Sequence, residues 1–321
     1  MQVENSNPKL SVSLITYNQQ GFITQAIESV LMQQTDFNFE IVLGDDCSTD
    51  GTREICIEYA KKYPELIQLR LPDRNLGFIR NMRENLMACK GEYIAILEGD
   101  DYWIDTKKLQ KQVDFLEKHL ECGLVCTDFE VINTETGEKG SSAEFYKTKA
   151  LKENFAYNFI DLLEHNFVGS PTAVFRNSGI DYKEILPNHY QTGDYPIWLH
   201  LALKCKFYYL SEISAVYRYI QGSLSHSEDK YKALQFGVNI EEIRYRFAKL
   251  AGVEQLLISE YPKLLKYQLK IAFQHNDKEF YYNAFNKLSI EFPEFIHFSE
   301  RLRKMIVGKI FLSNLFRLIK K

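Results

Sequence analysis

Apolar positions in the first third of the chain follow two periods, one typical of strands and one typical of helices. Short apolar runs predict strands over residues 10–15, 39–43, 67–71 and 93–97. Between them, apolar positions three or four apart predict helices over residues 22–31, 55–60 and 80–89. Strands that alternate with helices are typical of βαβ units, so we expect an α/β fold with a mostly parallel sheet flanked by helices.

The pattern beyond residue 107 is less regular. It predicts helices over residues 109–116 and 194–203, and strands over 123–129, 171–175, 207–210 and 215–220. Between them it predicts a hairpin tip at 134–138 and an irregular polar loop over 140–160, which we expect to lie near the ligand-binding edge of the sheet. From residue 228 onward the periodicity is almost continuously helical. We therefore expect one domain over residues 1–227 and a helical C-terminal region over 228–321.

Polar and acidic side chains follow three of the predicted strands at the point where each ends. These side chains are Thr16, Tyr17 and Asn18, then Asp45 and Asp46, and then Glu98, Asp100 and Asp101. Ligands of open α/β sheets bind beyond the carboxyl ends of the strands, so we expect the three clusters to face one crevice. Crowded carboxylates suit a divalent metal, Mn²⁺ or Mg²⁺, beside substrate phosphates. For one cluster alone, a polar loop that caps a strand is the alternative explanation.

Composition and charge exclude several classes of protein. A hydrophobic content of 45% with 26% charged residues indicates a globular protein, and a net charge of -4 argues against wholesale nucleic-acid binding. The six cysteines show no C-x-x-C pair, which favours reduced thiols over disulfides or a structural zinc. The polar N-terminus lacks a secretory signal, and no apolar run approaches the roughly 20 residues that span a bilayer. We expect a cytoplasmic protein.

Basic and apolar residues interleave over residues 301–321. One interpretation is a basic amphipathic helix that rests on the inner face of the membrane, which would make the protein peripheral. The other is a helix packed on its own domain with a solvated basic face. The sequence leaves both open.

Six motifs, in this order, resemble the family 2 glycosyltransferases. They are Val12–Asn18, Ile27–Gln33, Asp45–Thr52, Asn75-x-Gly77, Gly91–Ile94 and Glu98–Asp101. The resemblance covers roughly residues 10–226. It implies the GT-A fold, a Rossmann-like mixed sheet with a nucleotide-binding half over about residues 1–105 and an acceptor half over about 106–227.

The resemblance also implies a nucleotide site. In similar enzymes a tyrosine at the place of Tyr17 packs by a uracil ring, and an aspartate at the place of Asp46 hydrogen-bonds the base, with Asp45 beside it. Thr16, Asn18, Asn75, Gly77 and Arg80 belong to the same implied site. Helix capping is the alternative role for the acids here, and we expect Asp50 to take it. Arg80 and Arg218 suit a phosphate, but both also suit surface ion pairs.

The loop from Glu98 to Asp101 occupies the place of the family's Asp-x-Asp metal motif. By resemblance, Asp100 and Asp101 hold the metal, while Glu98 replaces the usual first aspartate and has either a ribose or a metal contact. His226 resembles an element that supplies a metal ligand or a phosphate contact in some relatives. A structural histidine is the alternative for His226.

A general base is implied at Asp194, within the stretch Thr192–Trp198. The alternative is that Asp194 caps the helix that starts there. The implied reaction is inverting transfer of a sugar from a nucleotide-diphospho-sugar donor, a UDP-sugar, to a glycan or lipid-linked acceptor. A nucleotidyltransferase usually has a Gly-rich, basic loop after the first strand, where this chain has Thr16–Gln20. A non-catalytic sugar-nucleotide-binding module is the third hypothesis, and Glu98 is the hint in its favour.

Overall fold

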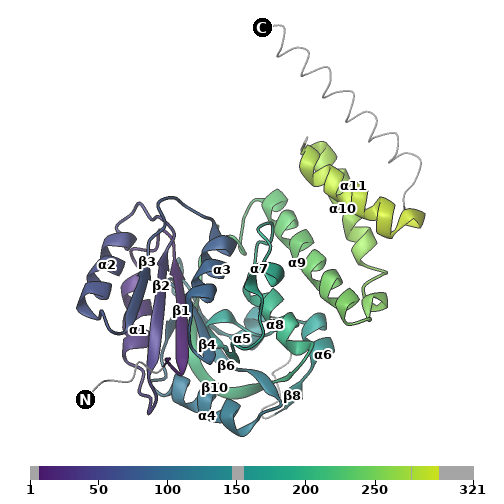
Figure 1. The fold of residues 1–321 in the computed structure, drawn as a ribbon. Helices are drawn as coiled ribbons and strands as arrows, with labels where there is room; N and C mark the ends of the chain where they lie inside the picture. The colour runs from purple at the N-terminus through teal and green to yellow at the C-terminus, as the bar shows by residue number, and fades with distance from the viewer. Residues whose placement is uncertain (1–6, 147–154, 276, 296–321) are drawn as a thin grey trace, which may run out of the picture. The chain divides into compact units, whose positions relative to one another are not determined.

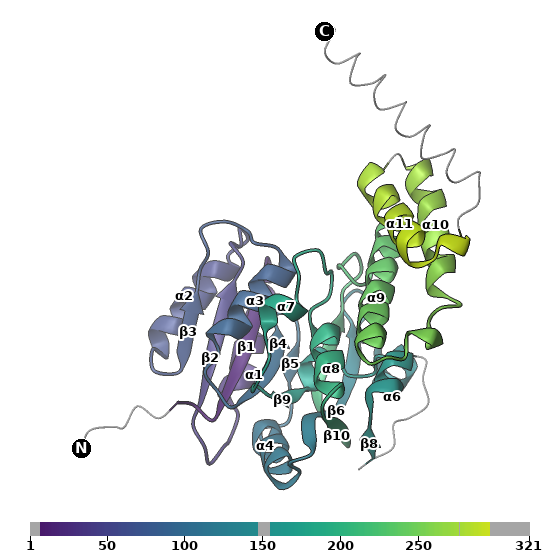
Figure 2. The same cartoon turned by 45° about the vertical axis from the view of Figure 1, so that its right-hand side comes forward.

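The computed structural model describes residues 7–146, 155–275 and 277–295. The chain divides into two compact units, Met1–His226 and Ser227–Lys321, and each is described by itself. Figures 1 and 2 show the α/β unit and the helical unit from two directions.

Four parallel strands form the first half of the sheet, in the order β3-β2-β1-β4. Their bounds are β1 (Leu10–Thr16), β2 (Phe39–Asp45), β3 (Ile67–Arg70) and β4 (Tyr93–Glu98). The connecting helices are α1 (Ile23–Leu31), α2 (Thr52–Lys62) and α3 (Phe78–Ala88). The central strands β1 and β4 are almost wholly buried, because both faces of a parallel sheet are covered. The alternation predicted from the apolar pattern is confirmed here.

The second half extends the sheet as β4-β9-β6-β10-β5. Its strands are β5 (Tyr102–Trp103), β6 (Cys122–Asn133), β9 (Val174–Arg176) and β10 (Lys206–Tyr219), with β7 (Lys139–Ser141) and β8 (Ala156–Tyr157) paired at the side. β6 and β10 are parallel, whereas β9 runs antiparallel to both of its neighbours. The result is a mixed sheet, mostly parallel in its first half, as the fold prediction states.

Three predictions in this half were wrong in detail. Pro171 and Thr172, the first two residues of the predicted strand 171–175, lie instead in a 3-10 turn, η1 (Ser170–Thr172), because Pro171 has no N–H for a strand ladder and suits the first turn of a helix. The two predicted late strands are one strand, β10, which bends where its register with β6 shifts near Ile213. Residues predicted as an irregular loop include β8, α5 (Ser142–Tyr146) and α6 (Phe159–Glu164), while 147–154 lie outside the described residues.

Three further helices belong to this unit: α4 (Lys108–Lys118), α7 (Tyr182–Ile185) and α8 (Asp194–Ala202). α8 buries almost its whole length, since Tyr195, Pro196, Ile197, Trp198 and Leu199 are all buried. Its first residue, Asp194, is therefore carried on a fixed element of the fold.

The second unit is helical where it is described. It consists of α9 (Lys230–Leu250), α10 (Tyr261–Gln274) and α11 (Lys278–Glu291), with short 3-10 turns η2 (Glu254–Leu256) and η3 (Pro293–Phe295). Stacked rings of Tyr245 and Tyr261, 4.7 Å apart, join α9 to α10. The predicted basic helix over 301–321 lies outside the described residues. Within the described ranges, none of the helices combines the length and apolar character needed to cross a membrane.

Candidate active site

The three polar clusters meet at one edge of the sheet. In the parallel register Thr16 pairs with Asp45 on β2, and Ile15 pairs with Glu98 on β4. The ladder continues one step past the strands, because Asp46 N–H donates to Thr16 O at 2.9 Å and Gly99 N–H donates to Ile15 O at 2.8 Å. These strand ends therefore lie side by side at one edge of the sheet.

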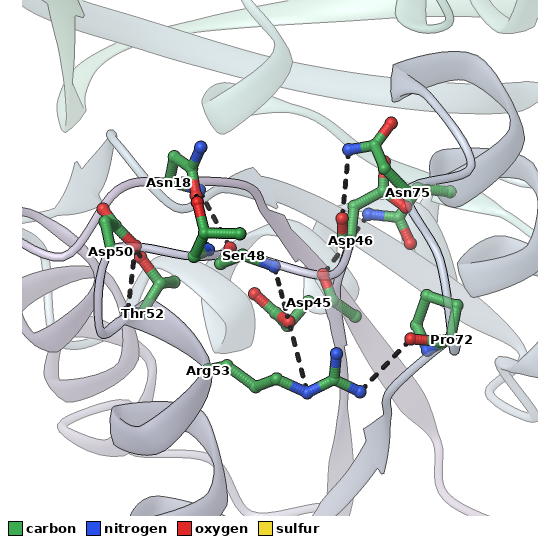
Figure 3. Close-up of polar contacts among 12 residues, drawn as sticks. Asn18, Asp45, Asp46, Ser48, Asp50, Thr52, Arg53, Pro72 and Asn75 are labelled. Atoms are coloured by element: carbon green, nitrogen blue, oxygen red, sulfur yellow. Dashed lines mark hydrogen bonds and ion pairs between the residues drawn. The ribbon is translucent and has the colours of Figure 1, made fainter.

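The loops after β1 and β2 interlock. Asn18 and Cys47 both have positive φ, at 50° and 62°, a region that costs an ordinary side chain energy unless its surroundings hold it. Asn18 N–H donates to Ser48 Oγ at 2.9 Å, and Thr49 N–H donates to Asn18 Oδ1 at 2.8 Å (Figure 3). The two loops thus form one rigid rim. Asp50 accepts the Thr52 N–H at 3.0 Å at the start of α2, but the N-cap residue of this helix is Gly51, so Asp50 contacts the first turn from one position before the cap.

Asp46 organises the loop that leads into α3. Its carboxylate oxygens accept the backbone N–H groups of Leu76, at 2.7 Å, and Gly77, at 2.9 Å. Asn75 Nδ2 donates to the Asp46 backbone carbonyl at 3.1 Å (Figure 3). Gly77 has a φ of 83°, so a residue without Cβ suits this turn. Three predicted site residues are therefore in direct contact.

Asp45 lies beneath this rim and is fully buried. Its Oδ2 accepts Ser48 N–H at 3.2 Å and lies 3.9 Å from Arg53 Nε, and Arg53 also donates to Pro72 O (Figure 3). Its Oδ1 is buried with no hydrogen-bond partner. Tyr17, by contrast, is 47% exposed, so its ring is accessible to a ligand.

The loop after β4, residues 98–101, is called the acid loop here, and it is held by a residue of β10 in the second half of the sheet. Arg218 N–H donates to Asp101 Oδ1 at 2.8 Å, and the Arg218 guanidinium donates to Asp100 O and Gln25 Oε1. The guanidinium also stacks 4.5 Å from the Tyr102 ring and 5.0 Å from the Phe22 ring. The arginine expected to face a phosphate is thus bound to the acid loop itself.

Burial sets the electrostatics of this loop. It raises the pKa of Glu98 to about 8, and the nearby charges of Asp100 and Asp194 act in the same direction. The pKa of Asp101 is raised well above its usual range by burial and then by Asp100 and Glu98. Burial also raises the pKa of Asp100, whose Oδ1 has no hydrogen-bond partner. Such a cluster favours either protons or a cation between the carboxylates.

Asp194 lies beside this cluster, although it comes from α8. Its Oδ1 accepts the Thr192 hydroxyl at 2.5 Å and the Tyr195 N–H at 2.7 Å, and burial raises its pKa. Gly193 occupies the N-cap position of α8, so Asp194 is the first helical residue and not the cap. The charge of Asp194 thus acts on Glu98, which joins α8 electrostatically to the loop that carries Asp100 and Asp101.

Two predicted residues lie further from the acids. His226 Nε2 is 2.9 Å from the Tyr217 hydroxyl, whose pKa is raised by burial and by the charges of Asp101 and Glu98. His226 is thus bonded to a tyrosine that is within the electrostatic influence of the acid loop. Arg80 pairs with Glu84 at 2.8 Å and lines a cavity of about 410 Å³ that is also bordered by Tyr190, Gln191 and Leu224.

Sequence reasoning missed two residues of the site. Ser170 Oγ donates to Glu98 Oε1 at 3.3 Å, and Gln19 accepts the Thr16 hydroxyl at 2.8 Å. A Cβ at Gly99 would lie 2.6 Å from Gln19 Oε1, so the acid loop also packs tightly on this pair. No sequence signal marks Ser170, because the turn that carries it falls where the apolar pattern predicts a strand.

Comparison with known proteins agrees with this geometry. Residues 11–182 match the family model described as Glycosyl transferase family 2. The chain belongs to that family. The family's matched range includes β1 to β4, the acid loop and Ser170, while Asp194, Arg218 and His226 lie beyond it.

Relatives of this family member come from several organisms. An uncharacterized protein of Mycobacterium tuberculosis is 34% identical over 68% of this chain and 61% of its own length. The matched part of the chain therefore spans less than two thirds of that relative. The putative teichuronic acid biosynthesis glycosyltransferase TuaG of Bacillus subtilis is 30% identical over 76% of this chain and 92% of its own length.

Solved structures support the fold assignment. The S. aureus TarS 1-349 structure in complex with UDP covers 93% of this chain and 78% of its own, with a TM-score of 0.55 at 17% identity. The Pyrobaculum calidifontis mannosyltransferase PcManGT, in complex with GDP-Man and Mn²⁺, covers 99% of this chain and 89% of its own, with a TM-score of 0.53 at 16% identity. These likenesses concern the fold alone.

Proposed function

We propose that this family 2 member is an inverting glycosyltransferase that moves a sugar from a nucleotide-diphospho-sugar, a UDP-sugar, to a glycan or lipid-linked acceptor. The observation that carries the proposal is that the buried carboxyl of Asp194, on α8, acts electrostatically on Glu98 of the acid loop, at the carboxyl end of β4. A carboxylate base next to a site for diphosphate and metal is the arrangement that direct displacement at a sugar carbon requires. Two comparisons support the assignment: the TarS structure is a complex with UDP, and TuaG is named a putative glycosyltransferase.

A divalent metal, Mn²⁺ or Mg²⁺, fits the acid loop. Asp100 Oδ1 is buried without a partner, and burial raises the pKa values of both Asp100 and Asp101, so a cation between them would offset the cost of their charged forms. Within the described residues, however, no three histidine, cysteine or acidic side chains form a ready metal cage. We therefore assign the metal to Asp100 and Asp101, with the remaining ligands drawn from the donor's phosphates, as is usual for Mg²⁺ sites. Bound there, the metal would stabilise charge on the departing diphosphate.

The nucleoside is assigned to the rim formed by the loops after β1 and β2, together with the loop after β3 that Asp46 holds. The exposed ring of Tyr17 suits stacking on a base. Both carboxylate oxygens of Asp46 already accept a backbone N–H, whereas Asp45 Oδ1 has no partner. In our proposal Asp46 shapes the Asn75–Gly77 loop that borders the base, and the buried Asp45 supports this rim from beneath.

Asp194 is assigned the role of general base. It removes the proton from the acceptor hydroxyl while that oxygen attacks the anomeric carbon from the face opposite the leaving diphosphate, so the configuration inverts. Thr192 and the Tyr195 N–H hold one of its oxygens. The cavity of about 410 Å³ between the start of α3 and the loop before Asp194 is a suitable place for the acceptor.

Further parts of the proposal concern organisation in the cell. We assign the nucleotide to the half over about residues 1–105 and the acceptor to about 106–227, with 228–321 as a separate helical region. A cytoplasmic protein that contacts the inner face of the membrane through residues 301–321 would meet a lipid-linked acceptor there. Loss of liposome association after deletion of 301–321 is the expected result, and unchanged association would contradict this part.

Product analysis tests the function. We expect release of UDP from a UDP-sugar with Mn²⁺ present, and no release after chelation of the metal. Pyrophosphate release would instead indicate a nucleotidyltransferase. Tight binding of UDP-sugars by calorimetry, with no turnover on any of a panel of glycan and lipid acceptors, would indicate a binding module.

A further inference from the structure

A lysine is buried beneath the site. Lys108, the first residue of α4, is 1% exposed, and burial lowers the pKa of its ammonium to about 7. Its Nζ donates to Gln112 Oε1 at 2.6 Å and to Thr172 O at 3.3 Å, and it lies 4.7 Å from the Trp103 ring. A buried ammonium that pairs with neutral acceptors costs stability, so its presence requires another explanation.

Three donors converge on one turn of the chain. Trp103 Nε1 donates to Pro171 O at 2.8 Å, while Lys108 Nζ and Gln112 Nε2 both donate to Thr172 O, the latter at 2.8 Å. Two successive carbonyls of η1 are therefore held from α4 and β5. All three donor side chains are at most 1% exposed, so water does not compete for these bonds.

The same turn reaches the acid cluster. Ser170, which precedes the two held carbonyls, donates its hydroxyl to Glu98 Oε1, and Glu98 in turn interacts with Asp100 and Asp194. Trp103 comes two residues after Asp101, so the network is also joined to the acid loop through the chain. A displacement of the turn would thus change the position of the Glu98 carboxyl relative to the acid loop and to Asp194.

We propose that Lys108 is a positioning residue: with Gln112 and Trp103 it fixes the Ser170–Thr172 turn, and through Ser170 it keeps Glu98 in place between the acid loop and Asp194. This inference rests on the proposed function for its catalytic part. Its structural part stands independently, because it concerns the turn alone.

Hydrogen exchange tests the structural part without any substrate. The Thr172 and Ala173 amides bond within the turn, to Gly169 O at 3.0 Å and Ser170 O at 3.4 Å. We expect exchange at these amides to become about fivefold faster or more in Lys108→Met and in Trp103→Phe, with exchange over β1 unchanged. Lys107→Met, at the exposed neighbouring lysine, is the matched control and leaves exchange at the turn unchanged. Equal exchange in Lys108→Met and wild type would overturn the proposal.

A double-mutant cycle tests the catalytic part, with hydrolysis of UDP-N-acetylglucosamine in Mn²⁺ as the probe reaction. We expect kcat to fall about tenfold in Lys108→Met and in Ser170→Ala, with KM for the donor little changed. Because both act through one turn, the double variant keeps the kcat of the single variants. The positioning role would be overturned if the loss of kcat in the double variant equalled the product of the two single losses. It would also be overturned if the single variants changed KM and left kcat unchanged. If wild type releases no UDP from this or any other UDP-sugar, the proposed function fails, and exchange at the turn still decides whether Lys108 holds it.

Discussion

The backbone N–H of Arg218 donates to the Asp101 carboxylate at 2.8 Å, although the two residues lie 117 positions apart. This bond joins β10, near the far edge of the sheet, to the loop that follows β4. The Arg218 side chain adds a bond to Asp100 O on the same loop and another to Gln25 on α1. The acid loop is therefore held by the second half of the unit as well as by the strands that carry it.

Replacement of Arg218 tests this support. Arg218→Lys keeps a charge but loses the planar group that stacks between the Tyr102 and Phe22 rings. We expect at least about a tenfold loss of turnover and weaker Mn²⁺ activation in Arg218→Lys. A Mn²⁺ titration of donor hydrolysis measures both. The same substitution at the exposed Arg74 is the control, and equal activity in the two variants would show that the guanidinium is not needed.

Asp46→Asn tests the organisation of the nucleotide rim. An asparagine accepts from only one of the Leu76 and Gly77 N–H groups, and its amide N–H₂ faces the other donor. We expect a loss of about 1–3 kcal/mol in the free energy of unfolding, measured by urea denaturation, and weaker UDP binding by calorimetry. Unchanged stability with weaker binding would instead mean that Asp46 acts on the nucleotide and not on the loop.

Gly99→Ala tests the packing of the acid loop on the loop after β1. The new Cβ would lie 2.6 Å from both Gln19 Oε1 and Thr16 Oγ1, so one of the two loops must move. We expect a loss of stability of about 1–3 kcal/mol and a fall in turnover. Gly21→Ala is the matched control, because a Cβ there meets nothing within 4 Å. Equal melting temperatures for the two variants would contradict the tight contact.

The dependence of stability on pH tests the electrostatics of Glu98. Its pKa is about 8 in the folded protein against an ordinary value of 4.5, so between those values the folded state binds more protons than the unfolded state. Stability therefore falls as pH rises through this window. We expect Glu98→Gln to be more stable than wild type at pH 9, by at least about 1 kcal/mol, and equal to it near pH 4.

Two comparisons make that experiment specific. Glu135→Gln, at an exposed position, is expected to leave the pH dependence unchanged. Mn²⁺ at pH 9 is expected to stabilise wild type more than Glu98→Gln, because a cation offsets the ionised cluster. A Glu98→Gln variant that loses stability at high pH would contradict the buried, crowded environment assigned to this carboxyl.

The first half of the fold could be predicted from the sequence because its order is local. The apolar runs of β1 to β4 are bounded by glycine and polar residues, and parallel strands must present their carboxyl ends at one edge. That rule alone predicts that Thr16, Asp45 and Glu98 lie together. Asp194 was expected at the site from the family resemblance, and the residues alone favoured helix capping.

The remaining features depend on contacts between distant segments. The bond between Arg218 and Asp101, and the turn that brings Ser170 to Glu98, join residues far apart in sequence, and neither leaves a local pattern. Pro171 delays the start of the strand predicted over 171–175, which begins only at Val174, because the proline ring removes a ladder donor. The position of Asp194 at the first turn of α8, and not at its cap, is likewise a property of the packed helix.

UDP release by Asp194→Asn tests the central claim most directly, because this substitution keeps the size and hydrogen-bonding shape of the side chain while removing the base. With a UDP-sugar, Mn²⁺ and an accepted glycan, we expect at least about a hundredfold fall in kcat with UDP affinity unchanged, and an inverted anomeric centre in the wild-type product. Asp181→Asn, at the cap of the short helix α7, is the control and is expected to keep kcat. Wild-type turnover in Asp194→Asn would contradict the account.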